Sequence, residues 1–144
     1  MKFNVTIDRL DSFAKEFWDY VKDAKVFAFH GEMGAGKTTV ISVLARFRGT
    51  LDITSSPTFS IINEYSFLEQ GEEKSFYHID LYRLNGDQEV MQAGVEDCIY
   101  SGEICMVEWP EKSPALFESD AIHVYIEKIS ESERSILVKL PLML

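Results

Sequence analysis

The most constraining feature of this 144-residue chain is the segment GEMGAGKT at residues 31–38, which has the GxxxxGK[ST] spacing of a phosphate-binding loop. Its glycines permit backbone conformations and close approaches that a Cβ atom would block. The loop N–H groups can then surround a phosphate, while Lys37 reaches the β- and γ-phosphates and Thr38 binds Mg²⁺. The candidate nucleotide-binding residues are Gly31, Glu32, Met33, Gly34, Ala35, Gly36, Lys37, Thr38 and Thr39.

The segments on either side of the loop match its usual structural context. The apolar run at residues 26–30 predicts a buried strand, and residues 39–47 have the pattern of a helix that ends near Gly49. A glycine loop between a strand and a helix N-terminus is an anion site, because the helix dipole and free N–H groups point at the phosphates. The flanks therefore argue against a chance match to a glycine-rich turn.

The charge of the chain limits its partners. Fourteen Lys and Arg residues stand against twenty-four Asp and Glu residues, for a formal net charge of −10. Proteins that grip nucleic acid by themselves usually present a basic face, so strong direct binding to nucleic acid is not expected. An acidic surface is more compatible with a basic protein partner.

The remaining composition is that of an ordinary globular protein in the cytoplasm. No apolar run approaches the length of a membrane span, and no signal peptide is visible at the N-terminus. The two cysteines, Cys98 and Cys105, have neither CxxC nor zinc spacing, and we expect Cys105 to be a buried reduced thiol. We expect one domain over residues 1–144, no membrane association and a cytoplasmic location.

Alternating strands and helices predict an α/β class: a P-loop NTPase-like three-layer fold with a mixed, mostly parallel central sheet. Asp8 is predicted to cap a first helix, whose apolar stripe includes Phe13 and Phe17. The further elements expected are a helix at 9–22, a hairpin at 59–82 with a turn at 70–73, a helix at 87–93, and strands at 104–107, 121–127 and 134–140.

Two acids lie at or near the ends of predicted strands and are candidates for chemistry. Glu108 comes after the strand at 104–107, where strand ends line ligand crevices, and we expect it to help Thr38 hold Mg²⁺ rather than to be an exposed carboxylate. Asp80 shares a strand face with His78 and could orient or deprotonate an attacking water. A salt bridge from Asp80 to Arg83, or a turn cap, is an equally good interpretation, and His78 is expected to be a hydrogen-bonded structural residue.

Residues Ser56, Pro57 and Thr58 form a hydroxyl-rich segment between the phosphate-loop helix and the hairpin. Such a segment could approach Mg²⁺ or the γ-phosphate and become ordered only with ATP. An ordinary turn, in which Pro57 sets φ, explains the same residues.

Four blocks together resemble the TsaE family of bacterial P-loop ATPases, which are needed for threonylcarbamoyladenosine modification of tRNA. The blocks are GEMGAGKTT at 31–39, SPTFSIINEY at 56–65, HIDLYRL at 78–84 and VEWPE at 107–111. They occur in the family's order, and the resemblance covers nearly the whole chain. The chain departs from the pattern at Glu32, where the family commonly has Asp, and the match after Pro114 is loose, which leaves any nucleotide contact by Arg134 open.

The resemblance implies a role for each matching residue. Lys37 and the loop amides would hold the phosphates of ATP or ADP, and Thr38 and Glu108 would hold Mg²⁺. Asp80 would be the acid essential for hydrolysis, and residues 56–58 would belong to a nucleotide-sensitive switch loop.

The resemblance also implies partners. These are the TsaD and TsaB proteins, which carry out the transfer to position 37 of tRNA, and ATP hydrolysis by this chain alone would be weak. Trp109, next to the metal carboxylate, is a candidate partner contact, although a core tryptophan is the simpler interpretation.

Three other functions share parts of this pattern. A small-molecule or nucleoside kinase would need an arginine-bearing lid to exclude water, and none of the five arginines lies in a recognisable lid. A non-catalytic nucleotide-sensing module is disfavoured by intact Lys37, Thr38, Asp80 and Glu108. A direct tRNA-binding enzyme is disfavoured by the charge of −10.

Overall fold

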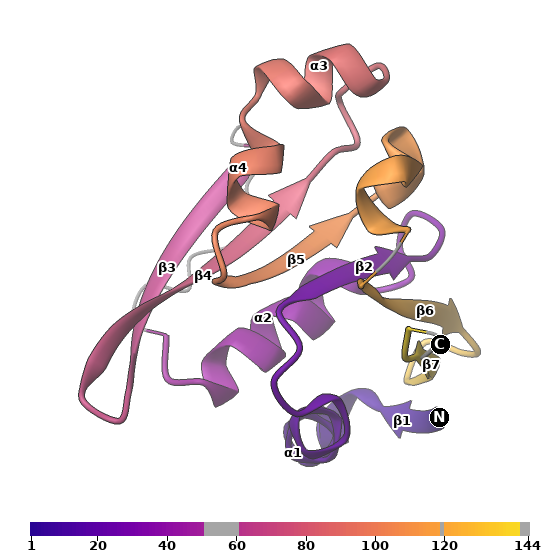
Figure 1. Ribbon diagram of the computed structural model, residues 1–144. Coiled ribbons are helices and arrows are strands. Elements are labelled where there is room, and N and C mark those ends of the chain that lie inside the picture. The colour runs from indigo at the N-terminus through magenta and orange to yellow at the C-terminus, as the bar shows by residue number, and fades with distance from the viewer. Residues whose placement is uncertain (51–60, 119, 142–144) are drawn as a thin grey trace.

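The computed structural model describes residues 1–50, 61–118 and 120–141, which form a seven-stranded sheet flanked by helices (Figure 1). The strands are β1 (Lys2–Thr6), β2 (Val26–His30), β3 (Ile62–Glu69), β4 (Glu72–Asp80), β5 (Ile104–Glu108), β6 (Ile122–Lys128) and β7 (Glu133–Lys139). The helices are α1 (Leu10–Val21), α2 (Lys37–Phe47), α3 (Asp87–Gln92) and α4 (Val95–Ile99), with 3-10 turns η1 (Ile7–Arg9), η2 (Pro110–Lys112) and η3 (Pro114–Phe117).

The strands lie in the order β1-β7-β6-β2-β5-β4-β3, with the phosphate-loop strand β2 at the centre. Strands β6, β2, β5 and β4 are parallel, while β1, β7 and β3 add antiparallel pairs at the two edges. The predicted α/β class and mixed sheet are confirmed. The parallel part is smaller than predicted, because both hairpins and β1 contribute antiparallel pairs, three of the six in all.

Each face of the sheet packs against its own pair of helices. On β2, Phe27 and Phe29 pack in the cluster that includes α1 and α2, while Ala28 between them packs in the cluster that includes α3 and α4. Parallel strands of this kind are buried on both faces, which is why β2 and β5 are apolar without alternation. The loops at the carboxyl ends of these strands are thereby held on a rigid frame.

Helix α1 is built by an amphipathic stripe of the kind predicted, in which Phe13 and Phe17 are buried. The predicted Asp8 cap is wrong. Asp8 lies in the 3-10 turn η1, and the N-cap position of α1 is Arg9, with no side-chain cap hydrogen bond. Burial of the apolar stripe therefore holds the start of this helix without help from a capping side chain.

The β3–β4 hairpin turns at two residues only. Gln70 and Gly71 have φ values of 51° and 82°, the pattern of a two-residue hairpin turn with both central residues at positive φ. Residues 72–73, predicted as turn, are therefore the first residues of β4, and the predicted strand start at 59–60 lies outside the described residues.

Besides the three 3-10 turns, one strand and one α-helix were not predicted. Strand β1 is a short edge strand in which Phe3 and Val5 are buried and alternate with exposed residues, and it pairs with β7. Helix α4 has only five residues and begins after Gly94, which has φ of 83°. Both are too short for a clear periodic signal.

Cys105 is buried in β5, as predicted, and neither cysteine forms a disulfide. Its Sγ donates to the carbonyl oxygen of Cys98 at 2.9 Å, and burial raises the pKa of the Cys105 thiol to about 12. The thiol is therefore protonated at neutral pH. Across the described ranges, the helices are too short or too polar to cross a membrane.

Candidate active site

The phosphate loop runs from the end of β2 to the start of α2, as the flanking sequence predicts. A Cβ atom at Gly31 would lie 2.7 Å from the backbone oxygen of Ile126 in β6, so only glycine allows this approach of loop and strand. Gly36 has φ of 101° at the N-cap position of α2. These two glycines therefore bring the loop onto the sheet and turn it into the helix.

Lys37 is the first residue of α2, and only 5% of it is exposed. Its Nζ donates to the carbonyl oxygen of Gly31 at 2.5 Å and lies 3.6 Å from the ring centroid of Trp109. Burial lowers the pKa of Lys37, and the nearby Glu108, Glu111 and Asp80 partly offset this effect. The ammonium group is thus held inside the curve of the loop that carries it.

Thr38 and Glu108 are in hydrogen-bond contact where the loop joins α2. The Oγ1 of Thr38 donates to Oε2 of Glu108 at 2.8 Å, joining α2 to the end of β5. Glu108 is 3% exposed, so the alternative of an exposed strand-end carboxylate is wrong. The Nε2 of His78 contacts the same oxygen at 2.6 Å, which confirms His78 as a buried, hydrogen-bonded residue.

Asp80 ends β4 directly beside Glu108 in the parallel register of β4 and β5. Its Oδ1 accepts the backbone N–H of Tyr82 at 3.0 Å, so the predicted turn cap is present. Burial, followed by the negative charge of Glu108, raises the pKa of Asp80, while the Tyr82 N–H bond acts in the opposite direction. Asp80 is therefore a half-buried carboxyl next to a second acid.

A pocket of about 420 Å³ joins these groups. Lys37, Thr38, Asp80 and Glu108 all line it, so residues up to 71 positions apart in sequence meet at one site. Met33, Gly34, Gly36 and Thr39 complete the phosphate-loop side, and Tyr82, Trp109 and Arg134 line the rest.

Some predicted residues do not reach this pocket. Gly31, Glu32 and Ala35 border a separate hollow of about 680 Å³ that is also lined by β6 and β7. The proposed switch residues Ser56, Pro57 and Thr58 lie outside the described residues. The site therefore contains the loop lysine, the hydroxyl and both acids, but not every residue of the loop.

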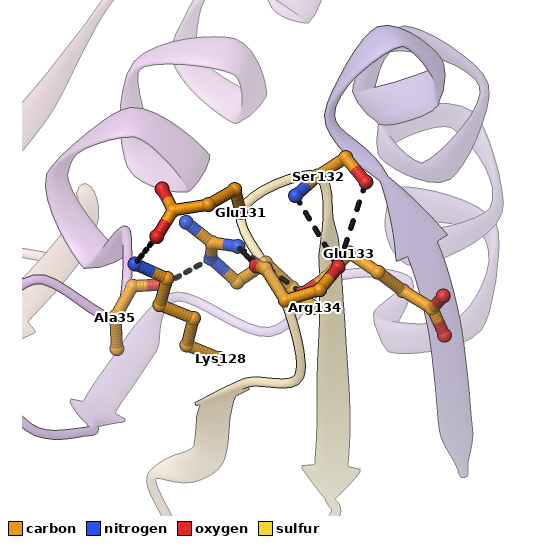
Figure 2. A network of polar contacts seen from close by, with 7 residues as sticks. Ala35, Lys128, Glu131, Ser132, Glu133 and Arg134 are labelled. Atoms are coloured by element: carbon orange, nitrogen blue, oxygen red, sulfur yellow. Dashed lines mark hydrogen bonds and ion pairs between the residues drawn. The ribbon is translucent and has the colours of Figure 1, made fainter.

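Arg134 connects the β6–β7 hairpin to the phosphate loop (Figure 2). Its Nε donates to the carbonyl oxygen of Ala35 at 2.8 Å, and its Nη1 donates to the carbonyl oxygens of Ser130 and Glu133 at 2.6 and 3.1 Å. Lys128 and Glu131 form an ion pair at 2.8 Å in the same hairpin. The sequence left a role for Arg134 near the nucleotide open, because the match after Pro114 is loose, and it did not predict the contact with Ala35.

Tyr82 lines the pocket but was not among the candidate site residues of the sequence analysis. It is 46% exposed, and its ring centroid lies 5.0 Å from that of Trp109, beside the pocket. The sequence signal for Tyr82 was its spacing: His78, Asp80 and Tyr82 alternate along the predicted strand and so share one face. Trp109 itself is partly buried and packs against the core cluster of α3 and α4.

The donor set suits a magnesium ion that arrives with phosphates. Within residues 1–50, 61–118 and 120–141, no three His, Cys, Asp or Glu side chains are grouped to hold a metal unaided. Magnesium is usually bound by one or two protein oxygens together with waters and substrate phosphates. The hydroxyl of Thr38 and the carboxylate of Glu108 provide such oxygens, already in contact at 2.8 Å.

The comparison with family models decides the family. Residues 5–136 match the model described as "Threonylcarbamoyl adenosine biosynthesis protein TsaE". This chain belongs to the TsaE family. It is thus a member of a family involved in the biosynthesis of threonylcarbamoyladenosine in tRNA, and the resemblance carried by the four sequence blocks is confirmed.

Comparisons with individual TsaE proteins and with a solved structure support the same family assignment. The chain is 32% identical to the Borreliella burgdorferi TsaE protein over 88% of this chain and 89% of the relative. It is 30% identical to the Bacillus subtilis TsaE protein over 81% of this chain and 70% of the relative. A crystal structure of Bacillus subtilis YdiB superposes with a TM-score of 0.72 at 25% identity, covering 98% of this chain and 85% of that one.

Proposed function

We propose that this chain is a Mg²⁺-dependent ATPase that acts, in the cytoplasm, in the modification of position 37 of tRNA together with TsaD and TsaB. The observation that carries the proposal is the 2.8 Å contact between Thr38 and Glu108 at the foot of the phosphate loop. Asp80 lines the same pocket. A hydroxyl, a metal-binding acid and a second acid around one phosphate site form the recurring apparatus of nucleotide hydrolysis.

The phosphate loop and Lys37 would bind ATP or ADP. The N–H groups of residues 33–39, in the loop and the first turn of α2, would favour an anion, and Lys37 would add a positive charge. Thr38 and Glu108 would hold Mg²⁺, which when bound supplies charge that neutralises the phosphate oxygens. To reach a phosphate, the Lys37 ammonium would exchange its contacts with Gly31 and Trp109 for phosphate oxygens.

Asp80 is the proposed catalytic acid. It stands beside Glu108 and lines the pocket, where it would orient a water and accept its proton during attack on the γ-phosphate. The raised pKa of Asp80, caused first by burial, makes its carboxylate a stronger base than one in free solution. Lys37 would stabilise the charge that develops on the transferred phosphate.

Partner proteins would complete the site. Tyr82 is 46% exposed and Met33 is 68% exposed around the phosphate pocket, so both side chains are accessible to a partner that covers it. Closing a pocket of this kind excludes bulk water and strengthens its electrostatic interactions. We expect hydrolysis by the chain alone to be weak and to rise when TsaB and TsaD cover the site, and Trp109 is the proposed contact residue.

The test is ATP hydrolysis by the purified chain, measured alone and with TsaB and TsaD. We expect the rate to be low for the chain alone, to rise at least several-fold with both partners, and to vanish in EDTA. Transfer of phosphate to a small metabolite, with no stimulation by the partners, would instead indicate a kinase. ATP binding without hydrolysis under either condition would indicate a non-catalytic nucleotide-sensing module.

A further inference from the structure

A buried histidine contacts the proposed metal carboxylate from the side of the protein core. His78 lies on β4 two residues before Asp80, and Asp80 is the residue in register with Glu108. His78 is only 2% exposed, and its Nε2 lies 2.6 Å from Oε2 of Glu108. The pair therefore connects the site to the interior of the sheet rather than to solvent.

Both described hydrogen bonds to the Glu108 carboxylate reach the same oxygen. Oε2 accepts from Thr38 Oγ1 at 2.8 Å and contacts His78 Nε2 at 2.6 Å. A carboxylate that holds a metal ion only accepts hydrogen bonds, so in the proposed site His78 is the donor of the second contact. Within the described part of the chain, Oε1 has no such contact, and Glu108 lines the phosphate pocket.

Two donors on one oxygen restrict rotation of the carboxylate. With Thr38 of α2 as its only donor, the Glu108 carboxylate could turn about a single hydrogen bond. A second donor, from His78 of β4, restricts this rotation. Residues that hydrogen-bond a metal ligand from outside commonly set its orientation, and their loss typically weakens metal binding 10- to 100-fold. A histidine that merely fills space in the core would have no such effect.

We infer that His78 is a positioning residue, which through its Nε2–H holds Glu108 so that Oε1 is presented to a nucleotide-bound divalent cation. The inference deepens the proposed function and rests on it. It separates His78, which acts through Glu108, from Asp80, which lines the pocket itself and is the proposed catalytic acid.

The test measures binding of a fluorescent ADP, N-methylanthraniloyl-ADP, by the full chain as MgCl₂ is titrated and again in EDTA. His78→Phe keeps a ring of similar size but removes the donor. We expect it to raise the half-saturating Mg²⁺ concentration about 10- to 100-fold, while affinity for the nucleotide in EDTA changes less than about two-fold. His78→Gln places an amide N–H near the position of Nε2 and should restore the Mg²⁺ midpoint to within a few-fold of the unmodified chain.

Two further variants separate positioning from folding. Phe76→Leu alters a fully buried side chain on the same face of β4, and should lower the melting temperature without moving the Mg²⁺ midpoint. If His78→Phe does not fold, His78→Asn replaces it, because the asparagine amide is too short to reach where the glutamine amide does. The difference in Mg²⁺ midpoint between His78→Asn and His78→Gln then tests the same role.

Each outcome decides the inference. An unchanged Mg²⁺ midpoint in His78→Phe, or equal impairment in His78→Gln and His78→Phe, would overturn the positioning role while the proposed ATPase stands. Binding of the fluorescent ADP by the unmodified chain with no dependence on Mg²⁺ would overturn the proposed metal site and the inference together. A raised midpoint in His78→Phe that His78→Gln restores would establish the role.

Discussion

The Nζ of Lys37 lies 3.6 Å from the ring centroid of Trp109, so the lysine of the GxxxxGK[ST] loop faces an aromatic ring that lines the same pocket. A cation over the face of a tryptophan is attracted by the ring quadrupole. The same ammonium donates to the Gly31 carbonyl oxygen at 2.5 Å, which holds it within the loop. A single side chain thus links the loop, α2 and Trp109, the residue that follows Glu108.

Lys37→Ala should weaken ADP binding at least about 100-fold, because it removes the positive charge that meets the β-phosphate. Isothermal titration in the presence of Mg²⁺ measures the affinity. Lys15→Ala is the matched control, since Lys15 pairs with Asp19 on the exposed face of α1, and it should bind like the unmodified chain. Equal affinity in both variants would remove Lys37 from the nucleotide site.

Asp80→Asn should reduce ATP hydrolysis at least about 100-fold and change the ADP dissociation constant less than about three-fold. The amide keeps an oxygen for the Tyr82 N–H but cannot accept a proton from water. The rate is measured by phosphate release with saturating ATP and Mg²⁺. Hydrolysis at the unmodified rate would show that the catalytic assignment is wrong.

Arg134→Ala should weaken ADP binding about ten-fold, because the Ala35 carbonyl loses a charged donor and the phosphate loop loses its anchor to the β6–β7 hairpin. Arg134→Lys should rescue little of the loss, since lysine lacks the planar group that reaches both Ala35 and Ser130. Arg46→Ala, at the far end of α2, provides the comparison and should bind normally. Full affinity in Arg134→Ala would show that the loop needs no support from this hairpin.

The free energy of unfolding should fall as the pH drops below about 6.5, in part because of His30. Burial, followed by the neighbouring His123, lowers the pKa of His30 in the folded chain below the 6.5 of the unfolded chain. The unfolded state then binds more protons below this pH, so the stability contributed by neutral His30 is present above it and lost on acidification.

Urea denaturation between pH 7.5 and 5 tests this effect. The His30 and His123 rings are joined by a 2.8 Å hydrogen bond, and a His30→Asn variant should show a shallower loss of stability with acid. The carboxylates titrate in both chains, so the difference between the two slopes reports His30. Parallel pH profiles would mean that His30 carries no such linkage.

Much of the site follows from local sequence. The loop at residues 31–38 has glycines where a Cβ would collide or strain the backbone, and the apolar run before it is a strand because both of its faces are buried. Glu108 directly follows a run of buried residues, so its place at a strand end was readable. Spacing and burial within a few residues are sufficient for these features.

Elements that are stabilised by contacts distant in sequence were harder to predict from the local sequence. The Asp8 cap was expected from residue type, but η1 occupies that position and packing of Phe13 and Phe17 holds α1. Strand β1 has only the alternation of Phe3 and Val5, and its pairing with β7 joins the two ends of the described chain. No local pattern contains that partner.

The sequence by itself determined the phosphate loop, the two acids and the family, since each depends on residue types at short, fixed spacings. Only the tertiary structure decided which groups meet them. His78 reaches Glu108 across 30 positions and Arg134 reaches Ala35 across 99, through strand order and side-chain direction. Such contacts depend on the order of the strands in the sheet, and this order cannot be predicted from the residues adjacent in sequence.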